Sequence, residues 1–531
     1  MFESARIQTL WELVDHRAGA SPDAPMFFDG EGRTVTFGEA RDQALQVAAG
    51  FRELGIGAGT RVVWQLPTRI GTVIASIALA RLGAVQTPVI HLHREREVGF
   101  ILAESAAEFV LVPGVWRGFD FTAMARKLAG DGVRVLTVEE EGPGGGGYGL
   151  PSGDPRALAA PAPVPAPDGH ATGDTRWIYY TSGTTSSPKG VEHTDASLIA
   201  GGVGLATALG MSADDVGSIA FPYAHIAGPD YLIAMLVSGF PAVVIEVFRP
   251  GDAAAVYRRH GVTMAGGSTA FYQAFLDESR RYRQESPRAG RLIPALRLLS
   301  GGGAPLPPEL YAEARRELGC ALVHGYGMTE SPMIAMGTPY DRDEQLAHTV
   351  GRPVAGARVR IARPDGSAAA AGETGEVRVK GPMVFRRYTD PALTADAFDA
   401  DGYFRTGDLG HLRPDGHLVL TGRSKDIIIR KGENISAQEI EDLLLTHPAV
   451  AEAAVIGLPD RARGERVCAV VTLAEPAAPP PTLAELTAHL RAAGLMPQKL
   501  PEQLEITAGL PRGGPLGKVL KTALRERYAP G

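Results

Sequence analysis

Short apolar runs with strand character alternate with helix-like segments over most of the chain, and this alternation narrows the choice of fold. The runs at residues 61–66, 109–112, 133–138 and 177–180 are strand-like, and a helical pattern follows the first of them through Leu82. Such alternation is typical of α/β layers around largely parallel sheets. Because 531 residues exceed what one hydrophobic core usually supports, two or more domains are expected.

The pattern changes near Arg423, where a short β run at residues 426–430 is followed by a glycine turn. Ser436 and Glu439 then stand at the spacing of a capping box, ahead of apolar residues at helical spacing. Two more β-rich runs complete a unit of roughly a hundred residues, a normal size for a domain. We therefore predict a large domain over residues 1–422 and a small α+β domain over residues 423–531, with a hinge at their boundary.

The composition argues against several classes of protein. A net charge of −7 gives no electrostatic signature of a nucleic-acid or anionic-membrane partner. Cys320 and Cys468 are the only two cysteines and lie far apart, which argues against a disulfide framework and a cysteine-based zinc site. The sequence shows no signal peptide and no apolar run long enough for a membrane span, so a cytoplasmic enzyme is expected.

A loop rich in small hydroxylated residues follows directly on the strand at residues 177–180. Residues 181–190 read TSGTTSSPKG. Small residues let backbone N–H groups approach a polyanion, the hydroxyl groups add donors, and Lys189 adds a positive charge. The loop therefore predicts a phosphate site, although it lacks the glycine spacing of a Walker A motif. A polar surface turn is the alternative interpretation.

Three later segments carry further candidate residues. Residues 324–332 read HGYGMTESP, in which Tyr326 is suited to stack on a base and Glu330 to bind a hard cation. In the segment GYFRTGDLG, Asp408 is suited to accept hydrogen bonds from both ribose hydroxyl groups. Near the end, LPRGGPLGKVLK contains Lys518. The alternatives are a solvated glutamate, a plain turn and an exposed lysine, respectively.

Together and in this order, these segments resemble the adenylate-forming superfamily of acyl-CoA synthetases, nonribosomal peptide adenylation domains and firefly luciferase. The resemblance covers nearly the whole chain. It implies an α/β fold: a large N-terminal domain of layered α/β sheets plus a β-barrel-like subdomain, followed by a small mobile α+β C-terminal domain. The segment KGENISAQEIE is similar to the fatty and aliphatic acyl-CoA synthetases within this superfamily. The stretches PVIHLHREREVGFIL and VPGVWRGFDF are similar to ligases for alicyclic and medium-chain acids.

The resemblance assigns roles to individual residues. The residues that it implies for nucleotide binding are Thr181, Ser182, Gly183, Thr184, Thr185, Lys189, Gly302, Gly303, Ala304, Tyr326, Gly327, Met328, Thr329, Asp408 and Arg423. The acyl group is expected against Tyr223, His225, Gly301, Gly302 and Gly327. Lys518, His225 and Glu330 are the catalytic candidates, with Glu330 also the Mg²⁺ ligand. The hinge and thiolation residues are Lys425, Lys431, Gly432 and Glu433.

Two of these interpretations stay open at the level of the residues. His225 stands where the family has a residue that gates the carboxylate, and its alternative is a partly buried histidine with satisfied hydrogen bonds. Asp230 is the only acid near the acyl segment and is interpreted as structural, which favours an apolar carboxylic acid over an amino acid.

The activity implied is a two-step ligation. A carboxylate attacks ATP to give acyl-AMP and pyrophosphate, and the small domain then rotates so that the thiol of CoA receives the acyl group. The expected cofactors are ATP (or a supplied acyl-AMP), CoA and Mg²⁺. The alternatives are loading of a carrier protein, thioester formation from a pre-made acyl-adenylate only, and adenylate binding without turnover. The oligomeric state stays open, with a homodimer as one option.

Three departures from the family pattern bear on the adenylation step. Ser186 replaces a glycine of the phosphate loop. A side chain at this position restricts φ, and a strained backbone conformation there costs about 1–3 kcal/mol. The segment at residues 513–516 has one residue more than the family pattern before Gly517 and Lys518. Arg387 stands where the family has glycine before Tyr388. The first two motivate the hypothesis that adenylation is slow or absent.

Overall fold

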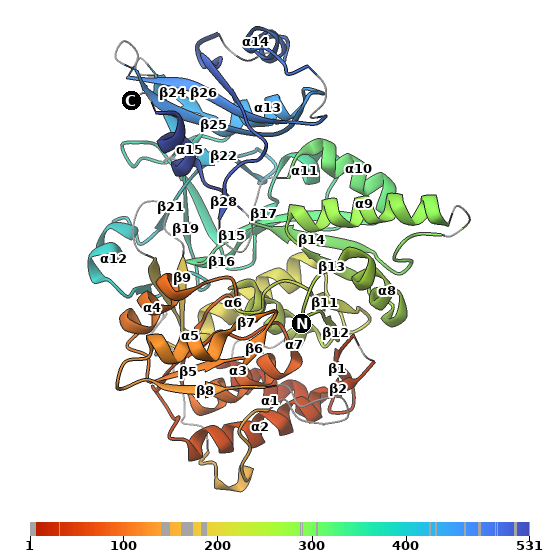
Figure 1. Cartoon of the computed structure of the whole chain (residues 1–531), viewed down its shortest axis with the longest axis vertical. Helices are drawn as coiled ribbons and strands as arrows, with labels where there is room; N and C mark the ends of the chain where they lie inside the picture. The colour runs from red at the N-terminus through yellow and green to blue at the C-terminus, as the bar shows by residue number, and fades with distance from the viewer. Residues whose placement is uncertain are drawn as a thin grey trace. The chain divides into compact units, whose positions relative to one another are not determined.

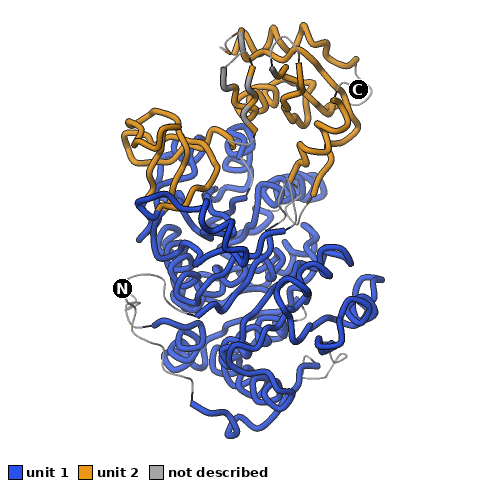
Figure 2. The backbone as a smooth tube through the Cα atoms, turned by 90° about the vertical axis from the view of Figure 1, so that its left-hand side faces the viewer, with its two compact units in different colours: residues 1–182, 188–358, 380–402 blue, residues 183–187, 359–379, 403–531 orange. Residues whose placement is uncertain are grey.

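Two compact units make up the protein in the computed structural model (Figure 2). Residues 1–182, 188–358 and 380–402 form unit 1, and residues 359–379 and 403–531 belong to unit 2. The predicted functional boundary at residues 422 and 423 stays a prediction, because the contacts group the sheet just before it with the C-terminal residues. The structure describes residues 7–30, 32–139, 149–160, 174–181, 188–286, 288, 290–303, 306–423, 426–430, 433–460, 464–475, 479–493, 495, 497–513 and 518–529.

A seven-stranded sheet forms the first layer of unit 1 (Figure 1). Its strands, in spatial order, are β20 (Arg387–Tyr388), β10 (Lys189–His193), β9 (Trp177–Thr181), β4 (Val85–Pro88), β3 (Arg61–Trp64), β5 (Phe109–Val112) and β8 (Arg134–Thr137). The strands from β9 to β8 are parallel, whereas β10 and β20 run antiparallel to their neighbours. The helix α3 (Ile70–Leu82) is apolar on all sides and buried along most of its length, as expected for a core helix.

A five-stranded sheet carries the second group of motifs. Its order is β13 (Met264–Gly267), β14 (Leu298–Gly302), β15 (Ala321–Met328), β16 (Ser331–Met336) and β17 (Arg352–Pro353). The first three strands are parallel, and β15 turns back into β16 through Thr329 and Glu330. The carboxyl end of β15 and its turn therefore present the residues of the HGYGMTESP segment.

Close helix packing supports both sheets. The helices α6 (Asp195–Leu209) and α7 (Ala227–Ser238) approach closely because glycines of α6 face α7. A Cβ atom at Gly202 would lie 2.5 Å from Cγ2 of Ile233, too close for any side chain. A smaller sheet of β11 (Gly217–Ile219), β12 (Ala242–Val244), β1 (Pro25–Phe28) and β2 (Thr34–Thr36) completes unit 1.

The described residues of unit 2 form two larger sheets and the two-stranded pair of β28 (Arg512–Gly513) and β29 (Lys518–Val519). The strands β18 (Arg358–Ala362), β19 (Gly375–Lys380), β21 (Phe404–Leu412) and β22 (Leu418–Arg423) form a four-stranded sheet at the place of the expected β subdomain. The second sheet has the order β24 (Glu433–Ser436), β23 (Ile427–Arg430), β26 (Gly464–Leu473) and β25 (Val450–Asp460), and β27 (Gln503–Ile506) also pairs with β26. Helices α13 (Ala437–Leu445), α14 (Leu483–Ala492) and α15 (Lys521–Tyr528) accompany it.

The predicted cap of the first C-terminal helix is confirmed in part. Oγ of Ser436 accepts a 3.3 Å hydrogen bond from the backbone N–H of Glu439 at the start of α13. The carboxylate of Glu439 instead receives Nζ of Lys499 at 2.6 Å, because an ammonium group is a stronger partner than a backbone N–H. The α/β class, with a large N-terminal and a small C-terminal part, is confirmed. Among the described residues, no helix has the length and apolar character needed to cross a membrane.

Candidate active site

Glu330 lies in the turn between β15 and β16 and is almost fully buried. Its Oε1 accepts a 2.8 Å hydrogen bond from the hydroxyl group of Tyr388 on β20. The ring of Tyr388 also faces Nζ of Lys189, which lies 5.4 Å from the ring centre, within the range of a cation–π interaction. One buried tyrosine therefore links the predicted metal-binding acid to the predicted phosphate-binding lysine.

The backbone around Glu330 is held from two sides. Nε2 of His193 lies 2.7 Å from the carbonyl oxygen of Thr329, and the N–H of Phe385 donates a 2.8 Å hydrogen bond to the carbonyl oxygen of Glu330. Burial lowers the pKa of His193 to about 4, so the imidazole is neutral at physiological pH. A neutral ring donates only one N–H, and the carbonyl oxygen of Thr329 makes Nε2 the protonated nitrogen.

Lys189 begins β10 and pairs in register with Thr181, the last residue of β9. The two ends of the predicted phosphate loop therefore meet across an antiparallel pair. Ser182, Gly183, Thr184, Thr185 and Ser186 lie outside the described residues, as do Ala304, Lys425, Lys431 and Gly432. Their predicted roles stay predictions.

The glycines assigned to the acyl and nucleotide sites are also required by the sheet. A Cβ atom at Gly302 would lie 2.7 Å from the carbonyl oxygen of Gly325, and one at Gly327 would lie 2.1 Å from that of Pro332. At Gly301 a Cβ atom would lie 2.7 Å from the hydroxyl oxygen of Tyr272. Close backbone approach is thus a sufficient reason for these glycines, and their contact with a substrate stays a prediction.

The remaining predicted residues of this region lie on the same elements. Tyr326 is buried on β15, where it pairs with Ala335, and Met328 ends the strand. Gly303 follows β14 with φ of +82°, a left-handed conformation that glycine adopts without strain. The carboxyl end of β14 and that of β15 are neighbours, which brings the two predicted segments together.

His225 lines a small cavity next to the turn of Glu330. Its Nδ1 accepts a 3.3 Å hydrogen bond from the N–H of Ala227. The hydroxyl groups of Tyr179 and Tyr180 are buried without a hydrogen-bond partner in the described part of the chain. The cavity is lined by Pro88, Val89, Ile90, His93, Ile101, Tyr179, Tyr180, Ala224, His225, Ile226 and Thr329.

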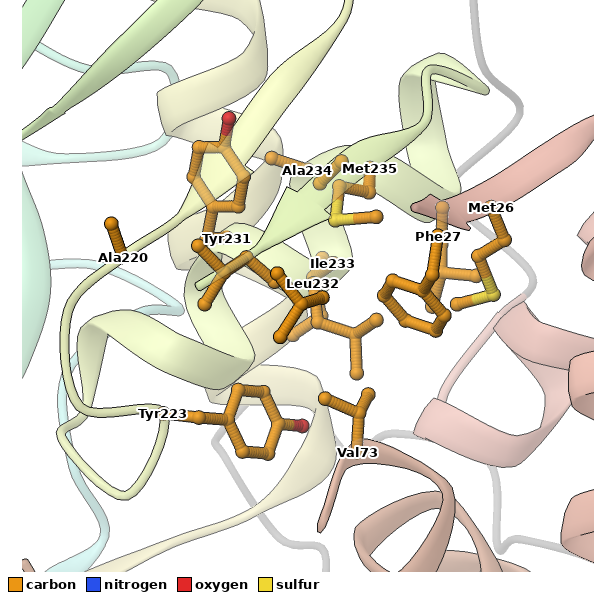
Figure 3. Close-up of a cluster of buried hydrophobic side chains, with 14 of the residues drawn as sticks. Met26, Phe27, Val73, Ala220, Tyr223, Tyr231, Leu232, Ile233, Ala234 and Met235 are labelled. Atoms are coloured by element: carbon orange, nitrogen blue, oxygen red, sulfur yellow. The ribbon is translucent and has the colours of Figure 1, made fainter. Parts of the chain in front are cut away.

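Tyr223 lies in the hydrophobic core and is not among the residues that line this cavity. Figure 3 shows its ring among buried side chains that include Val73 and Leu232. The ring stacks at 6.0 Å on Trp64, and the hydroxyl group reaches Oγ of Ser76 at 3.5 Å. Tyr223 and His225 thus have different surroundings, and the predicted contact of Tyr223 with the acyl group stays a prediction.

In unit 2, Asp408 and Arg423 face each other across the strands β21 and β22. Nε of Arg423 lies 2.9 Å from Oδ1 of Asp408, and the carboxylate is nearly buried while half of the arginine side chain is exposed. Thr406 supports the pair, because its Oγ1 accepts a hydrogen bond from the N–H of Asp408 and donates one to the carbonyl oxygen of Val377. The two predicted nucleotide contacts are thus one ion pair.

Lys518 begins the two-residue strand β29 (Lys518–Val519) and pairs with Gly513 of β28 (Arg512–Gly513). Its side chain is exposed. The extra residue of this segment falls within the hairpin, whose residues 514–517 lie outside the described residues. Glu433 is the first residue of β24 and pairs with Arg430 through the backbone.

A family model described as AMP-binding enzyme matches residues 14–389, and one described as AMP-binding enzyme C-terminal domain matches residues 439–515. This chain belongs to the AMP-binding enzyme family. The resemblance to adenylate-forming enzymes is thereby confirmed.

Individual members of the AMP-binding family are similar over nearly their whole length. A salicyl-AMP ligase / salicyl-S-ArCP synthetase of Mycobacterium tuberculosis is 35% identical, over 92% of this chain and 85% of the relative. A 2-hydroxy-7-methoxy-5-methyl-1-naphthoate–CoA ligase of Streptomyces carzinostaticus is 33% identical, over 97% and 93%. The structure of O-succinylbenzoate coenzyme A synthetase of Bacillus subtilis, in complex with ATP and magnesium ion, matches with a TM-score of 0.82, 28% identity and coverage of 97% and 99%.

A metal site in this AMP-binding enzyme would depend on few protein ligands. The described residues contain no group of three or more His, Cys, Asp or Glu side chains arranged to hold a metal ion. Mg²⁺ in nucleotide-binding enzymes commonly takes one or two carboxylates together with substrate phosphates. The single buried carboxylate of Glu330 fits this kind of site, in which the nucleotide would supply further ligands.

The structure also explains one departure from the family pattern. Nε of Arg387 lies 2.9 Å from Oε2 of Glu192, which also accepts a 2.6 Å hydrogen bond from Oγ1 of Thr175. Because neighbouring side chains of a strand point to opposite faces, Arg387 points away from the side on which Tyr388 meets Glu330. The ion pair of Arg387 with Glu192 thus joins β20 to β10.

Sequence reasoning missed Tyr388, Phe385 and His193 as site residues. Tyr388 is 58 positions from Glu330 and His193 is 136 positions from Thr329, so no local spacing connects them. The only sequence signal was the position of Tyr388 beside the atypical Arg387.

Proposed function

We propose that this protein is an ATP-dependent acid–thiol ligase, which converts a carboxylic acid to its acyl-AMP and transfers the acyl group to a pantetheine thiol. The observation that carries the proposal is the Lys189–Tyr388–Glu330 cluster at the start of β10 and the turn after β15, in which Tyr388 and Glu330 are buried. A fixed cation beside a fixed carboxylate suits the phosphates of a nucleotide and a hard metal ion. Charge stabilisation and positioning are what phosphate chemistry requires most from a protein.

The cofactors of the proposal are ATP, Mg²⁺ and CoA. Glu330 would hold Mg²⁺, which when bound neutralises phosphate charge, and Lys189 would contact the phosphates of ATP. Asp408, placed by its ion pair with Arg423, offers a carboxylate oxygen to the ribose hydroxyl groups. Lys518 is the candidate for the cation that joins the substrate carboxylate to the α-phosphate, and Lys425, Lys431, Gly432 and Glu433 are the candidates for the thiol-transfer step.

The proposed acid is an aromatic or other largely apolar carboxylic acid. The relatives described above are named for salicylate and for a hydroxylated naphthoate, which are hydroxy-aromatic acids. The cavity beside His225 is lined mainly by apolar residues, a composition compatible with the organic part of such an acid or with the thiol arm. The prediction of a medium-chain or alicyclic acid stays as the competing choice.

The proposed thiol is the pantetheine end of CoA or of a carrier protein. One relative is named a CoA ligase and another an S-ArCP synthetase, so both kinds of acceptor occur among similar proteins. CoA remains the first choice because of the KGENI segment, and the carrier protein is the alternative. A cytoplasmic location and a homodimer stay predictions.

The deciding experiment follows the two half-reactions separately. The enzyme is mixed with ATP, Mg²⁺ and each member of a panel of salicylate, hydroxynaphthoate, medium-chain and alicyclic acids, and pyrophosphate release is measured. Synthetic acyl-AMP is then supplied with either CoA or a phosphopantetheinylated carrier protein, and thioester is measured. Acid-dependent pyrophosphate release is expected.

The outcomes separate the candidate functions. Thioester formation from acyl-AMP without any pyrophosphate release would favour the thioesterification-only alternative. Stabilisation by AMP with no thioester from any acyl-AMP would leave only an adenylate-binding protein. Either result would contradict the proposed ligase.

A further inference from the structure

The hydroxyl group of Tyr388 is a hydrogen-bond donor to the candidate metal ligand. It donates a 2.8 Å hydrogen bond to Oε1 of Glu330. A charged carboxylate that receives such a donor is held in one orientation more firmly than one solvated by water.

Tyr388 is itself held by its surroundings on three sides. Its backbone pairs with Val191 of β10, and the next N–H, that of Thr389, donates a 2.9 Å hydrogen bond to the carbonyl oxygen of Gly190. The ring packs at 4.7 Å against Phe385, whose N–H binds the carbonyl oxygen of Glu330. The position of the hydroxyl group is thus set by the same strand that begins with Lys189.

One short segment therefore contacts both charged groups of the candidate site. Residues 385–389 bind the backbone of Glu330, its carboxylate and the strand β10, and the Tyr388 ring covers Nζ of Lys189. A hydrogen bond and a cation–π contact converge on a single side chain. A displacement of that side chain would move the carboxylate and the ammonium group together.

We propose that Tyr388 is a positioning residue, which orients the Glu330 carboxylate toward the nucleotide-bound metal ion and keeps the Lys189 ammonium group in line with the phosphates. This inference rests on the proposed function, because it presumes that Glu330 and Lys189 serve a metal–nucleotide complex. Tyr388 itself contacts neither reactant. Its effect is exerted through the direction in which the two charged groups point.

The test uses Mn²⁺ as a paramagnetic probe of the metal site. The full-length protein is titrated with Mn²⁺ in the presence of α,β-methylene-ATP, and free Mn²⁺ is followed by electron paramagnetic resonance. The variant Tyr388→Phe keeps the ring, and so the contacts with Lys189 and Phe385, but removes the donor to Glu330. Loss of a hydrogen bond to a charged group predicts weaker Mn²⁺ binding by about tenfold. The Mg²⁺ concentration for half-maximal pyrophosphate release is expected to rise similarly, with the KM of the acid unchanged.

A second tyrosine of unit 1 gives a matched control. The hydroxyl group of Tyr311, also buried, donates a 2.6 Å hydrogen bond to Oδ1 of Asp343 on the helix α11 (Asp343–His348). Tyr311→Phe thus removes the same kind of bond at a place outside the candidate site. It is expected to leave Mn²⁺ binding and the Mg²⁺ dependence unchanged, and melting temperatures of both variants report on folding.

A double-variant cycle ties the effect to Glu330. In a Glu330→Gln background, the amide is no longer a charged metal ligand, so Tyr388→Phe should change Mn²⁺ binding by less than twofold. Full additivity of the two losses, or a Tyr388→Phe variant that binds Mn²⁺ as the wild type does, overturns the inference. A wild-type protein that binds no Mn²⁺ with the nucleotide and releases no pyrophosphate overturns the proposed function as well.

Discussion

The hydroxyl group of Tyr388 donates a 2.8 Å hydrogen bond to Oε1 of Glu330, although 58 positions separate the two residues in the sequence. The same ring covers Nζ of Lys189 at 5.4 Å. The AMP-binding fold thus brings a carboxylate from one sheet and a lysine from another against one aromatic side chain. This relationship makes the acid at position 330 the most informative residue to change.

Glu330→Gln is expected to slow pyrophosphate release by about a hundredfold, because a preorganised charge is lost where phosphate charge is stabilised. Thioester formation from synthetic acyl-AMP should fall by no more than a few fold. The measurement is pyrophosphate release at saturating ATP and acid. Glu309→Gln, an exposed position on the helix α10 (Pro308–Leu318), is the control. An equal loss in both half-reactions would contradict a role confined to adenylation.

Asp408→Asn is expected to raise the Kd of ATP by about tenfold or more, because the amide is a weaker acceptor for ribose hydroxyl groups and breaks the ion pair with Arg423. Calorimetric titration with ATP gives the Kd. Glu376→Gln breaks a comparable ion pair, in which Nε of Arg378 lies 2.8 Å from Oε2 of Glu376 on β19 of the same sheet. Equal effects of the two variants would show that Asp408 acts on stability alone.

Lys518→Ala is expected to separate the two half-reactions. Removing the ammonium group should reduce pyrophosphate release by at least about a hundredfold, while thioester formation from synthetic acyl-AMP should remain. Both rates are measured on the same preparation. A wild type that already lacks pyrophosphate release, with Lys518→Ala unchanged in both rates, would support the hypothesis that the longer hairpin has disabled adenylation.

Asp230→Asn is expected to stabilise the protein increasingly as the pH rises. Burial raises the pKa of Asp230 to about 8, and Oδ1 has no hydrogen-bond partner among the described residues. The folded state therefore holds a proton that the unfolded state releases above about pH 4. The free energy of unfolding that this bound proton contributes declines as the pH rises from about 4. The contribution is lost at about pH 8, a change on the order of 5 kcal/mol between these two pH values.

The measurement is the melting temperature between pH 6.5 and 8.5. The buried His193 is neutral in the folded state over this range, and its contribution to stability, which declines as the pH falls from about 6.5 toward 4, is the same in the wild type and in Asp230→Asn. The advantage of Asp230→Asn over the wild type should grow with pH. Asp252→Asn, an exposed position on the helix α8 (Pro250–His260), should show no such trend. A constant difference would indicate that Asp230 is ionised.

Arg387→Ala is expected to lower stability by less than about 1 kcal/mol, because half of the arginine side chain is exposed and solvent screens its pairing with Glu192. Pyrophosphate release should change by less than about twofold, since Arg387 points away from the side that meets Glu330. Thermal melts and the pyrophosphate assay check the two expectations. A tenfold change in rate would mean that the arginine acts on the nucleotide site.

Much of the fold could be predicted because local sequence patterns determine it. Several predictions depended only on residues within a few positions of one another. They include the strands that end at residues 112 and 181, the Ser436 cap and each of the motifs. Alternating apolar character and turn residues report such local geometry directly. The cross-strand pair of Asp408 and Arg423 could also be predicted, because both residues belonged to motifs of one family.

What the sequence by itself determined, then, was the family and the α/β class, together with a set of charged residues as candidates for the site. Only the tertiary structure decided that Tyr388 and His193 hold the turn of Glu330, that Tyr223 belongs to the core and that Asp230 is buried between helices. The reason is physical. A side chain's partners depend on which face of which element packs against its own, and that is settled by the burial of distant apolar segments rather than by neighbouring residues.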